Sequence, residues 1–141
     1  MVSIAIRLLP RLIAPNPLDN NNRKIGGPIY ELGAVKAAIQ QHGVKVVNDN
    51  AQSDMVHEFD PPMDEEELAA FINSLMNIHF HASEWCKTSG KMIIDCDAYA
   101  MKWNRVNRCE WKYGEEVYVK FGFKEHHPFC IIVRVHPSTY T

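Results

Sequence analysis

The sequence lacks the short motifs that mark the best-known catalytic and cofactor-binding sites. It contains no GxGxxG, P-loop, GxSxG or HExxH segment. Its four cysteines include no CxxC pair, which argues against a zinc ribbon and against a thioredoxin-type redox site. We therefore expect reduced, mostly buried thiols, and a site that uses neither a metal nor a cofactor.

Long apolar runs are also missing. The most apolar stretch near the start, residues 2–13, is interrupted by Arg7, Pro10 and Arg11, and no basic segment precedes it. Such a stretch is too short to span a bilayer and is unlike a secretory signal. We expect a cytoplasmic protein with no membrane partner.

The charges nearly cancel, but they are unevenly distributed. The 15 Lys and Arg residues against 17 Asp and Glu residues give a net charge of −2. Residues 54–67 hold acids and no Lys or Arg, whereas bases outnumber acids in residues 102–134. The basic half suits an anionic partner and the acidic segment suits a basic one, although both patterns also fit an ordinary solvated surface.

The chain length fits a single domain. Residues 1–28 are expected to form an N-terminal arm and a loop rich in Pro, Asn and Gly, and residues 29–141 the domain itself. Helical periodicity predicts a first helix over residues 29–41. Residues 48–62 are expected to be a polar connection. A second helix follows Asp64, because Glu67 three positions later matches the spacing of a capping box.

From residue 77 the apolar period changes from that of a helix to that of a strand. Ile78, Phe80 and Ala82 alternate with His79 and His81. Residues 92–99 are expected to be extended, with a helical alternative for residues 98–101, and residues 103–113 a weaker strand. Residues 117–123 and 129–135 predict an antiparallel hairpin. The fold class is therefore α+β, with two N-terminal helices packed on a C-terminal antiparallel sheet.

The hairpin concentrates chemically useful side chains on one face of the sheet. Alternation predicts that Tyr118 and Lys120 on one strand share this face with Arg134 and His136 on the other. A phenol and an imidazole can transfer protons, and the two cations can stabilise phosphate charge. The residues suit RNA cleavage by attack of the 2′-hydroxyl, but an exposed sheet face without a function carries similar residues.

Two further groups invite a functional interpretation. His79 and His81 have the spacing at which strand residues can chelate a metal, although no third ligand is evident. Trp85, Trp103 and Trp111 can stack on nucleic-acid bases, but we expect them in the core.

Residues 30–138 resemble the MqsR-type toxins, the motility quorum-sensing regulator family of bacterial mRNA interferases. Three pieces carry the resemblance: residues 32–36 (LGAVK) followed by Gly43-Val44, residues 80–83 (FHAS), and the pair of segments 114–121 (GEEVYVKF) and 131–136 (IIVRVH). The first resembles the family's L-x-x-V-K and G-x-V. The second resembles its F-Y-K-S, and the third its G-x-V-Y-L-K-I and L-I-V-S-F-K strands.

The resemblance implies a RelE-like fold and a metal-independent endoribonuclease that cleaves mRNA and is silenced by a cognate antitoxin. The family's catalytic tyrosine falls on Tyr118 and its C-terminal lysine on His136. The lysine of F-Y-K-S falls on Ala82, so its role passes to His81. Lys120 and Arg134 are then expected to bind RNA.

Two alternatives remain from the residues themselves. One is a non-catalytic protein-binding module, similar to an antitoxin or an immunity protein, that uses the acidic segment 54–67. The other is a small metal-binding protein built on His79 and His81.

Overall fold

A computed structural model describes residues 6–46, 48–89 and 92–138. It is a mixed α+β protein, which confirms the expected class. The elements in chain order are β1 (Lys24–Ile25), α1 (Leu32–His42), β2 (Val44–Lys45), α2 (Asp49–His57), α3 (Glu65–Ser74), the 3₁₀ helix η1 (Asn77–His79), β3 (Phe80–Lys87), β4 (Ile93–Asn104), β5 (Cys109–Glu110), β6 (Glu115–Gly122) and β7 (Cys130–Pro137). None of the described helices combines the length and the apolar character needed to traverse a bilayer.

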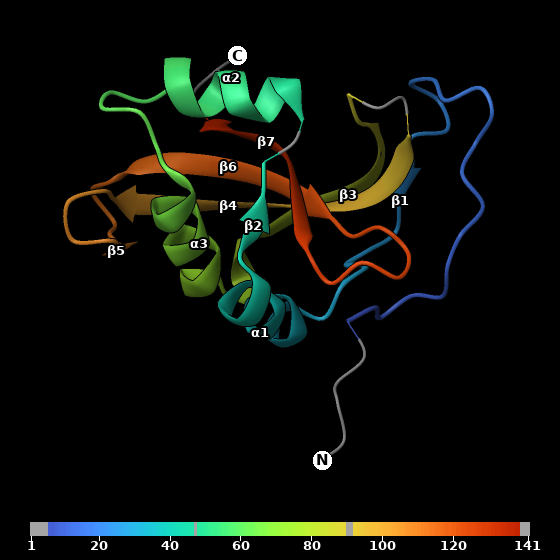
Figure 1. Ribbon diagram of the computed structural model, residues 1–141, viewed down its shortest axis with the longest axis horizontal. Helices are drawn as coiled ribbons and strands as arrows, with labels where there is room; N and C mark the ends of the chain where they lie inside the picture. Colours follow the sequence, from blue (N-terminus) through green and yellow to red (C-terminus); the bar gives the residue numbers. More distant parts are fainter. Residues whose placement is uncertain (1–5, 47, 90–91, 139–141) are drawn as a thin grey trace.

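The strands form one sheet in the order β1-β3-β4-β6-β7-β2, and β5 pairs with the far end of β4. The described pairings are antiparallel except for the short parallel contact between β2 and β7. Figure 1 shows β4 and β6 lying side by side across the middle of the molecule, with α2 above these strands in the view and α1 and α3 below them. The longest strands are thus central and the shortest lie at the edges, where little backbone is open to pairing with another chain.

The main hydrophobic core joins the helices to one face of the sheet, which we call the core face and define by Tyr99, Val119, Phe121 and Val135. Helix α3 shows how the sequence builds it. Oδ1 of Asp64 accepts a hydrogen bond from the backbone N–H of Glu67 at 2.7 Å, which confirms the expected N-cap. The apolar stripe of this helix is buried, as its periodicity predicts: Leu68, Phe71 and Ile72.

The prediction of a polar connection over residues 48–62 is wrong, because these residues include helix α2. This helix is stabilised by its contacts with the edge of β7. Nδ2 of Asn48 donates to the carbonyl of Val133 at 2.9 Å, and Oδ2 of Asp54 accepts from the backbone N–H of Val135 at 3.1 Å. The short strand β2 pairs with only part of this edge of β7. The side chains of Asn48, the N-cap residue, and of Asp54 in α2 bind backbone groups of β7 that would otherwise lack a partner.

Two other local predictions need correction. The alternation from Ile78 does not form a strand at its start, since Asn77–His79 form η1 and β3 begins at Phe80. Strand β4 continues through residues 98–101, which excludes the helical alternative there, and reaches Asn104. The weak strand expected over residues 103–113 is thus the end of β4 plus the two residues of β5.

The β6–β7 hairpin has the expected strands, but a β-bulge changes how the side chains of β7 are distributed. The register shifts between Lys120 and Phe121, so that Phe121 pairs with Ile132. Cys130 and Ile132 consequently join the main core with Val135, whereas Ile131 and Val133 belong to a second, smaller apolar cluster. Regular alternation in the sequence predicts instead that Ile131, Val133 and Val135 share one face. An extra residue in one strand reverses the alternation, and period-two reasoning does not detect it.

Candidate active site on the open face of the sheet

The face opposite the core, which we call the site face, carries the side chains that alternate with the core residues of β4, β6 and β7. In β6 and β7 these are the four residues expected from the sequence. Tyr118 is paired directly with His136, and Lys120 with Arg134. Directly opposed residues of antiparallel strands have side chains in contact. The rings of Tyr118 and His136 are stacked, with centroids 5.0 Å apart and an interplanar angle of 20°.

His81 joins this pair from β3. A register shift between Phe80 and Ala82 leaves His81 unpaired in the ladder, and bulges of this kind redirect a side chain. Its ring meets the Tyr118 ring edge-on, with centroids 5.9 Å apart. The structure therefore brings together Tyr118, His136 and His81, which the sequence placed at three separate points along the chain.

The environment of Tyr118 keeps its phenol protonated. The side chain is half-buried, and burial raises the pKa of Tyr118 above its ordinary value, with the charge of Lys120 offsetting part of the effect. A phenol with a raised pKa is neutral at physiological pH and donates a proton more readily than it removes one. Tyr118 is thus suited to the role of hydrogen-bond or proton donor.

The imidazole of His136 is oriented by the backbone carbonyl of the next residue. Its Nδ1 lies 2.9 Å from the carbonyl oxygen of Pro137. A carbonyl only accepts hydrogen bonds, so this contact places the proton of the neutral ring on Nδ1 and the acceptor on Nε2. An imidazole held in a single tautomer by a backbone carbonyl is a feature of positioned general bases.

The two expected phosphate-binding cations are each held by a carboxylate that the sequence did not identify. Nζ of Lys120 lies 2.7 Å from Oε1 of Glu84 on β3. Burial alone would lower the pKa of Lys120, but neighbouring Cys86 and Glu84 outweigh it and the pKa is raised. Arg134 binds Asp54 of α2 through Nε at 2.7 Å and through its Nη2 at 3.1 Å. Both side chains are charged and positioned, but their charge is partly neutralised.

A cavity of about 560 Å³ opens beside the Tyr118 group, toward β5. Ala100, which lines it, is the β4 residue paired with Tyr118, and Glu116, which also lines it, is two residues from Tyr118 on the same face of β6. The remaining lining residues come from η1, β4 and the β5 region: His79, Met101, Lys102, Glu110, Trp111 and Lys112. The cavity is large enough for a nucleotide-sized group.

The structure does not assemble the expected His79–His81 pair on a strand. His79 lies in η1, where its Nδ1 accepts the backbone N–H of Met76 at 2.8 Å and its Nε2 lies 2.7 Å from Oε2 of Glu110. Both ring nitrogens are therefore engaged in protein contacts. Within residues 6–46, 48–89 and 92–138, no three His, Cys, Asp or Glu side chains are grouped so as to hold a metal ion.

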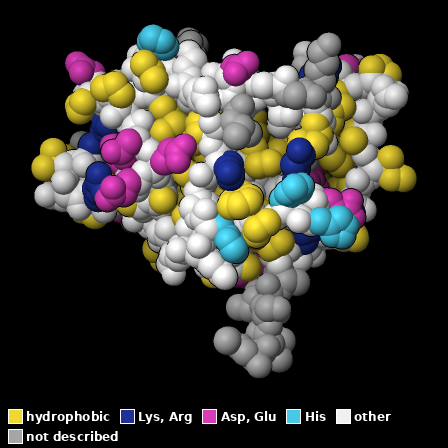
Figure 2. All heavy atoms as spheres, viewed as in Figure 1, with side chains coloured by type: hydrophobic (Ala, Val, Ile, Leu, Met, Phe, Trp, Pro, Cys, Tyr) yellow, Lys and Arg dark blue, Asp and Glu magenta, His cyan; other side chains and the backbone are white. Residues whose placement is uncertain are grey.

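The acidic segment 54–67 is largely occupied within the molecule. Asp64 caps α3, and three further acids bind arginines: Asp54 with Arg134, Glu66 with Arg108, and Glu67 with Arg105. Figure 2 shows the result, since acidic side chains over α3 stand close to basic ones rather than forming a patch of one sign. These contacts leave less negative charge for a basic partner than the sequence suggests.

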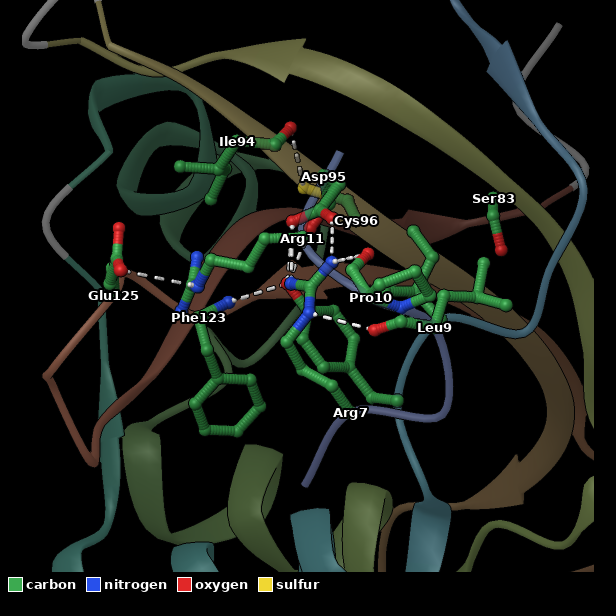
Figure 3. Close-up of polar contacts among 12 residues, drawn as sticks. Arg7, Leu9, Pro10, Arg11, Ser83, Ile94, Asp95, Cys96, Phe123 and Glu125 are labelled. Atoms are coloured by element: carbon green, nitrogen blue, oxygen red, sulfur yellow. Dashed lines mark hydrogen bonds and ion pairs between the residues drawn. The ribbon is translucent and has the colours of Figure 1, made fainter. Parts of the chain in front are cut away.

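A second polar cluster, which the sequence did not reveal, is centred on Asp95 and Asp97 of β4, and Figure 3 shows its part around Asp95. Asp97 accepts from the backbone N–H groups of Ile29 and Tyr30 and from the hydroxyl of Ser83. Arg7 points toward Asp95 and forms an ion pair with it. Because backbone donors satisfy Asp97 and the half-buried Arg7 satisfies Asp95, the cluster anchors the segment before α1 to β4 and is not arranged for catalysis.

Comparison with known proteins finds no matching family model, no matching curated protein and no matching solved structure. The functional interpretation therefore rests on the geometry of the site face.

Proposed function

We propose that this protein is a toxin-like endoribonuclease that cleaves mRNA by metal-independent acid–base catalysis. The observation that carries the proposal is the group of Tyr118, His136 and His81, in which a neutral phenol lies between two imidazoles. The group lies on an accessible sheet face next to a cavity of about 560 Å³. Two imidazoles and a phenol supply both a proton acceptor and a proton donor at neutral pH.

In this mechanism Nε2 of His136 accepts the proton of an RNA 2′-hydroxyl, and the 2′ oxygen attacks the adjacent phosphorus. The new bond from phosphorus to the 2′ oxygen forms as the bond to the 5′ oxygen breaks, which yields a 2′,3′-cyclic phosphate and a 5′-hydroxyl. Tyr118 donates the one proton that the leaving 5′ oxygen requires, and His81, whose ring contacts that of Tyr118, is the alternative donor at the same place. Comparison of Tyr118→Phe with His81→Ala separates these two donors.

Lys120 and Arg134 are proposed to face the phosphate from the adjoining cross-strand pair. Positive charge near the phosphoryl oxygens stabilises the transition state more than the ground state. The partial neutralisation of both cations by Glu84 and Asp54 fits an RNA contact that positions the substrate without binding it tightly.

The proposal extends to the fold and to regulation, on the basis of the resemblance to the MqsR-type toxins. The α+β chain is proposed to be RelE-like, to act in the cytoplasm where mRNA is found, and to be silenced by a cognate antitoxin. Co-expression of a neighbouring antitoxin gene should restore the growth of cells that express the chain.

Purified protein should cleave single-stranded RNA in the presence of EDTA, because none of the proposed steps uses a metal. Analysis of the products by gel and mass spectrometry should find 2′,3′-cyclic phosphate ends. Intact RNA under these conditions would contradict the proposal. Cleavage that appears only after a divalent metal is restored would point to a metal site instead.

Substitution of Glu84 by glutamine should strengthen RNA binding and make it more sensitive to salt. The change removes the negative charge of the carboxylate that lies 2.7 Å from Nζ of Lys120. The ammonium group of Lys120 can then pair with an RNA phosphate. One additional phosphate contact to a single strand makes the slope of log affinity against log salt steeper by about 0.7. The slope is measured by anisotropy of a labelled oligonucleotide, with exposed Glu115→Gln on β6 as the matched control. Equal slopes for the two variants would exclude Lys120 from the phosphate site.

A further inference from the structure

The turn around β5 exposes two aromatic rings where the sequence predicted a buried tryptophan. Trp111 is 46% exposed and Tyr113 is 72% exposed, whereas Trp85 and Trp103 are only 7% and 2% exposed. The rings of Trp111 and Tyr113 pack edge to face, with centroids 5.6 Å apart. Two adjacent aromatic rings open to solvent are a common feature of binding surfaces.

These two rings are carried by a well-anchored segment. The backbone N–H of Trp111 donates to the carbonyl of Lys102 at 3.1 Å, and the N–H of Gly114 donates to the carbonyl of Trp111 at 2.9 Å. Gly114 packs directly against the backbone of Trp103. A Cβ atom at position 114 would lie only 2.3 Å from the Trp103 carbonyl oxygen, so a larger residue does not fit at this position. Rings on a segment fixed in this way lose little conformational entropy when a ligand binds.

Positive charge accompanies the rings. Nζ of Lys112 lies 4.9 Å from the centroid of the Tyr113 ring, and Lys102, which is exposed, lines the same cavity as Trp111. Two acids line the same cavity: Glu110 is in contact with His79, and Glu116, which is paired with Lys102, accepts a hydrogen bond from the Ser138 hydroxyl. Aromatic faces interleaved with lysines match a chain of bases joined by phosphates.

The cavity connects Trp111, on which Tyr113 packs, to the neighbourhood of the proposed catalytic group. Trp111, Lys102 and Ala100 line it, and Ala100 is the residue paired with Tyr118. A strand of RNA that follows the cavity therefore passes from the aromatic rings to Tyr118 without leaving the site face.

We propose that Trp111 and Tyr113 form a stacking platform for the bases of single-stranded RNA that flank the phosphodiester cleaved at Tyr118. This inference rests on the proposed ribonuclease function, which it deepens by naming the side chains that hold the unpaired strand beside the cleaved bond. Lys102 and Lys112 contact the backbone of that strand. A base-paired duplex cannot present its bases to the rings and is a poor ligand.

The test uses a 2′-O-methyl RNA octamer, which cannot be cleaved because its 2′ oxygen carries no proton, so binding is measured apart from catalysis. Trp111→Ala and Tyr113→Ala should each raise the dissociation constant of the labelled octamer about tenfold, as expected for one stacked base. Val106→Ala, a change to a 91% exposed side chain on the neighbouring turn between β4 and β5, is the matched control and should leave it within about twofold. A duplex of the same sequence should bind more weakly than the single strand.

The possible outcomes test the stacking platform and the ribonuclease activity separately. Equal octamer affinity in Trp111→Ala and Val106→Ala would overturn the platform, and RNA cleavage by the unaltered protein would then still support the nuclease. Weakened octamer binding in Trp111→Ala, in a protein that cleaves no RNA, would support the platform and overturn the nuclease. Absence of octamer binding together with self-association that depends on Trp111 would identify a protein interface and overturn the platform.

Discussion

Substitution of His136 by alanine should lower the rate of RNA cleavage by about 10² to 10⁴-fold, the range that a positioned acid or base contributes. His136 stacks on Tyr118 with centroids 5.0 Å apart, and its Nδ1 is directed at the Pro137 carbonyl. The substitution removes the proposed acceptor Nε2, while His81 keeps its edge-on contact with the Tyr118 ring. Single-turnover cleavage of a defined RNA, with and without EDTA, measures the effect.

The matched control is His127→Ala, because His127 is an exposed imidazole in the loop between β6 and β7. Its cleavage rate should equal that of the unaltered protein. Tyr118→Phe keeps the stacked ring, removes only the hydroxyl, and should lower the rate by a comparable factor. A pair of His136→Ala and Tyr118→Phe variants that both cleave at the normal rate would end the ribonuclease proposal.

The pH dependence of cleavage supplies an independent check. Burial raises the pKa of Tyr118, so its phenol remains protonated at neutral pH and up to pH values above the ordinary range for tyrosine. A loss of rate between neutrality and about pH 9 therefore cannot come from deprotonation of Tyr118. Tyr118→Phe should lower the rate by a similar factor across this range and leave the shape of the pH profile unchanged.

Substitution of Asp97 by alanine should lower the free energy of unfolding by roughly 3 to 5 kcal/mol, the largest single-residue effect on stability that we expect outside the apolar core. Asp97 is fully buried and accepts from two backbone N–H groups, of Ile29 and Tyr30, and from the Ser83 hydroxyl. Alanine leaves these three donors buried without a partner. Urea unfolding at pH 7 measures the loss, with exposed Glu115→Ala as the control.

The pH dependence of stability follows from the same cluster. Ionisation of Asp97 and ionisation of Asp95 change the free energy of unfolding in opposite directions. Burial raises the pKa of Asp97, so its contribution favours folding below the ordinary carboxyl pKa and is lost as the pH rises. Burial alone would also raise the pKa of Asp95, but the hydrogen bond from Arg7 lowers it. The contribution of Asp95 is present above its ordinary pKa and is lost as the pH falls. An Asp97→Ala variant as stable as the unaltered protein at pH 7 would show that water replaces the carboxylate.

The sequence by itself determined the features that depend on a short stretch of residues. The N-cap of α3 is visible in the spacing of Asp64 and Glu67, and its buried stripe is visible in the helical period. Alternation in residues 117–121 places Tyr118 and Lys120 together on one face of β6, opposite the apolar residues of the core. Local periodicity was enough in these cases, because the side chains of a regular element point in directions set by that element alone.

The tertiary structure decided everything that depends on pairing between distant residues. Helix α2 has few apolar residues and depends on contacts with the edge of β7, and the two β-bulges shift the register at His81 and at Val133. The carboxylates that hold Lys120 and Arg134 come from β3 and α2. Trp111 is exposed because the β5 turn carries it beyond the helices. These outcomes depend on which strands lie side by side, and that choice is made by the burial of the whole core and not by any single segment.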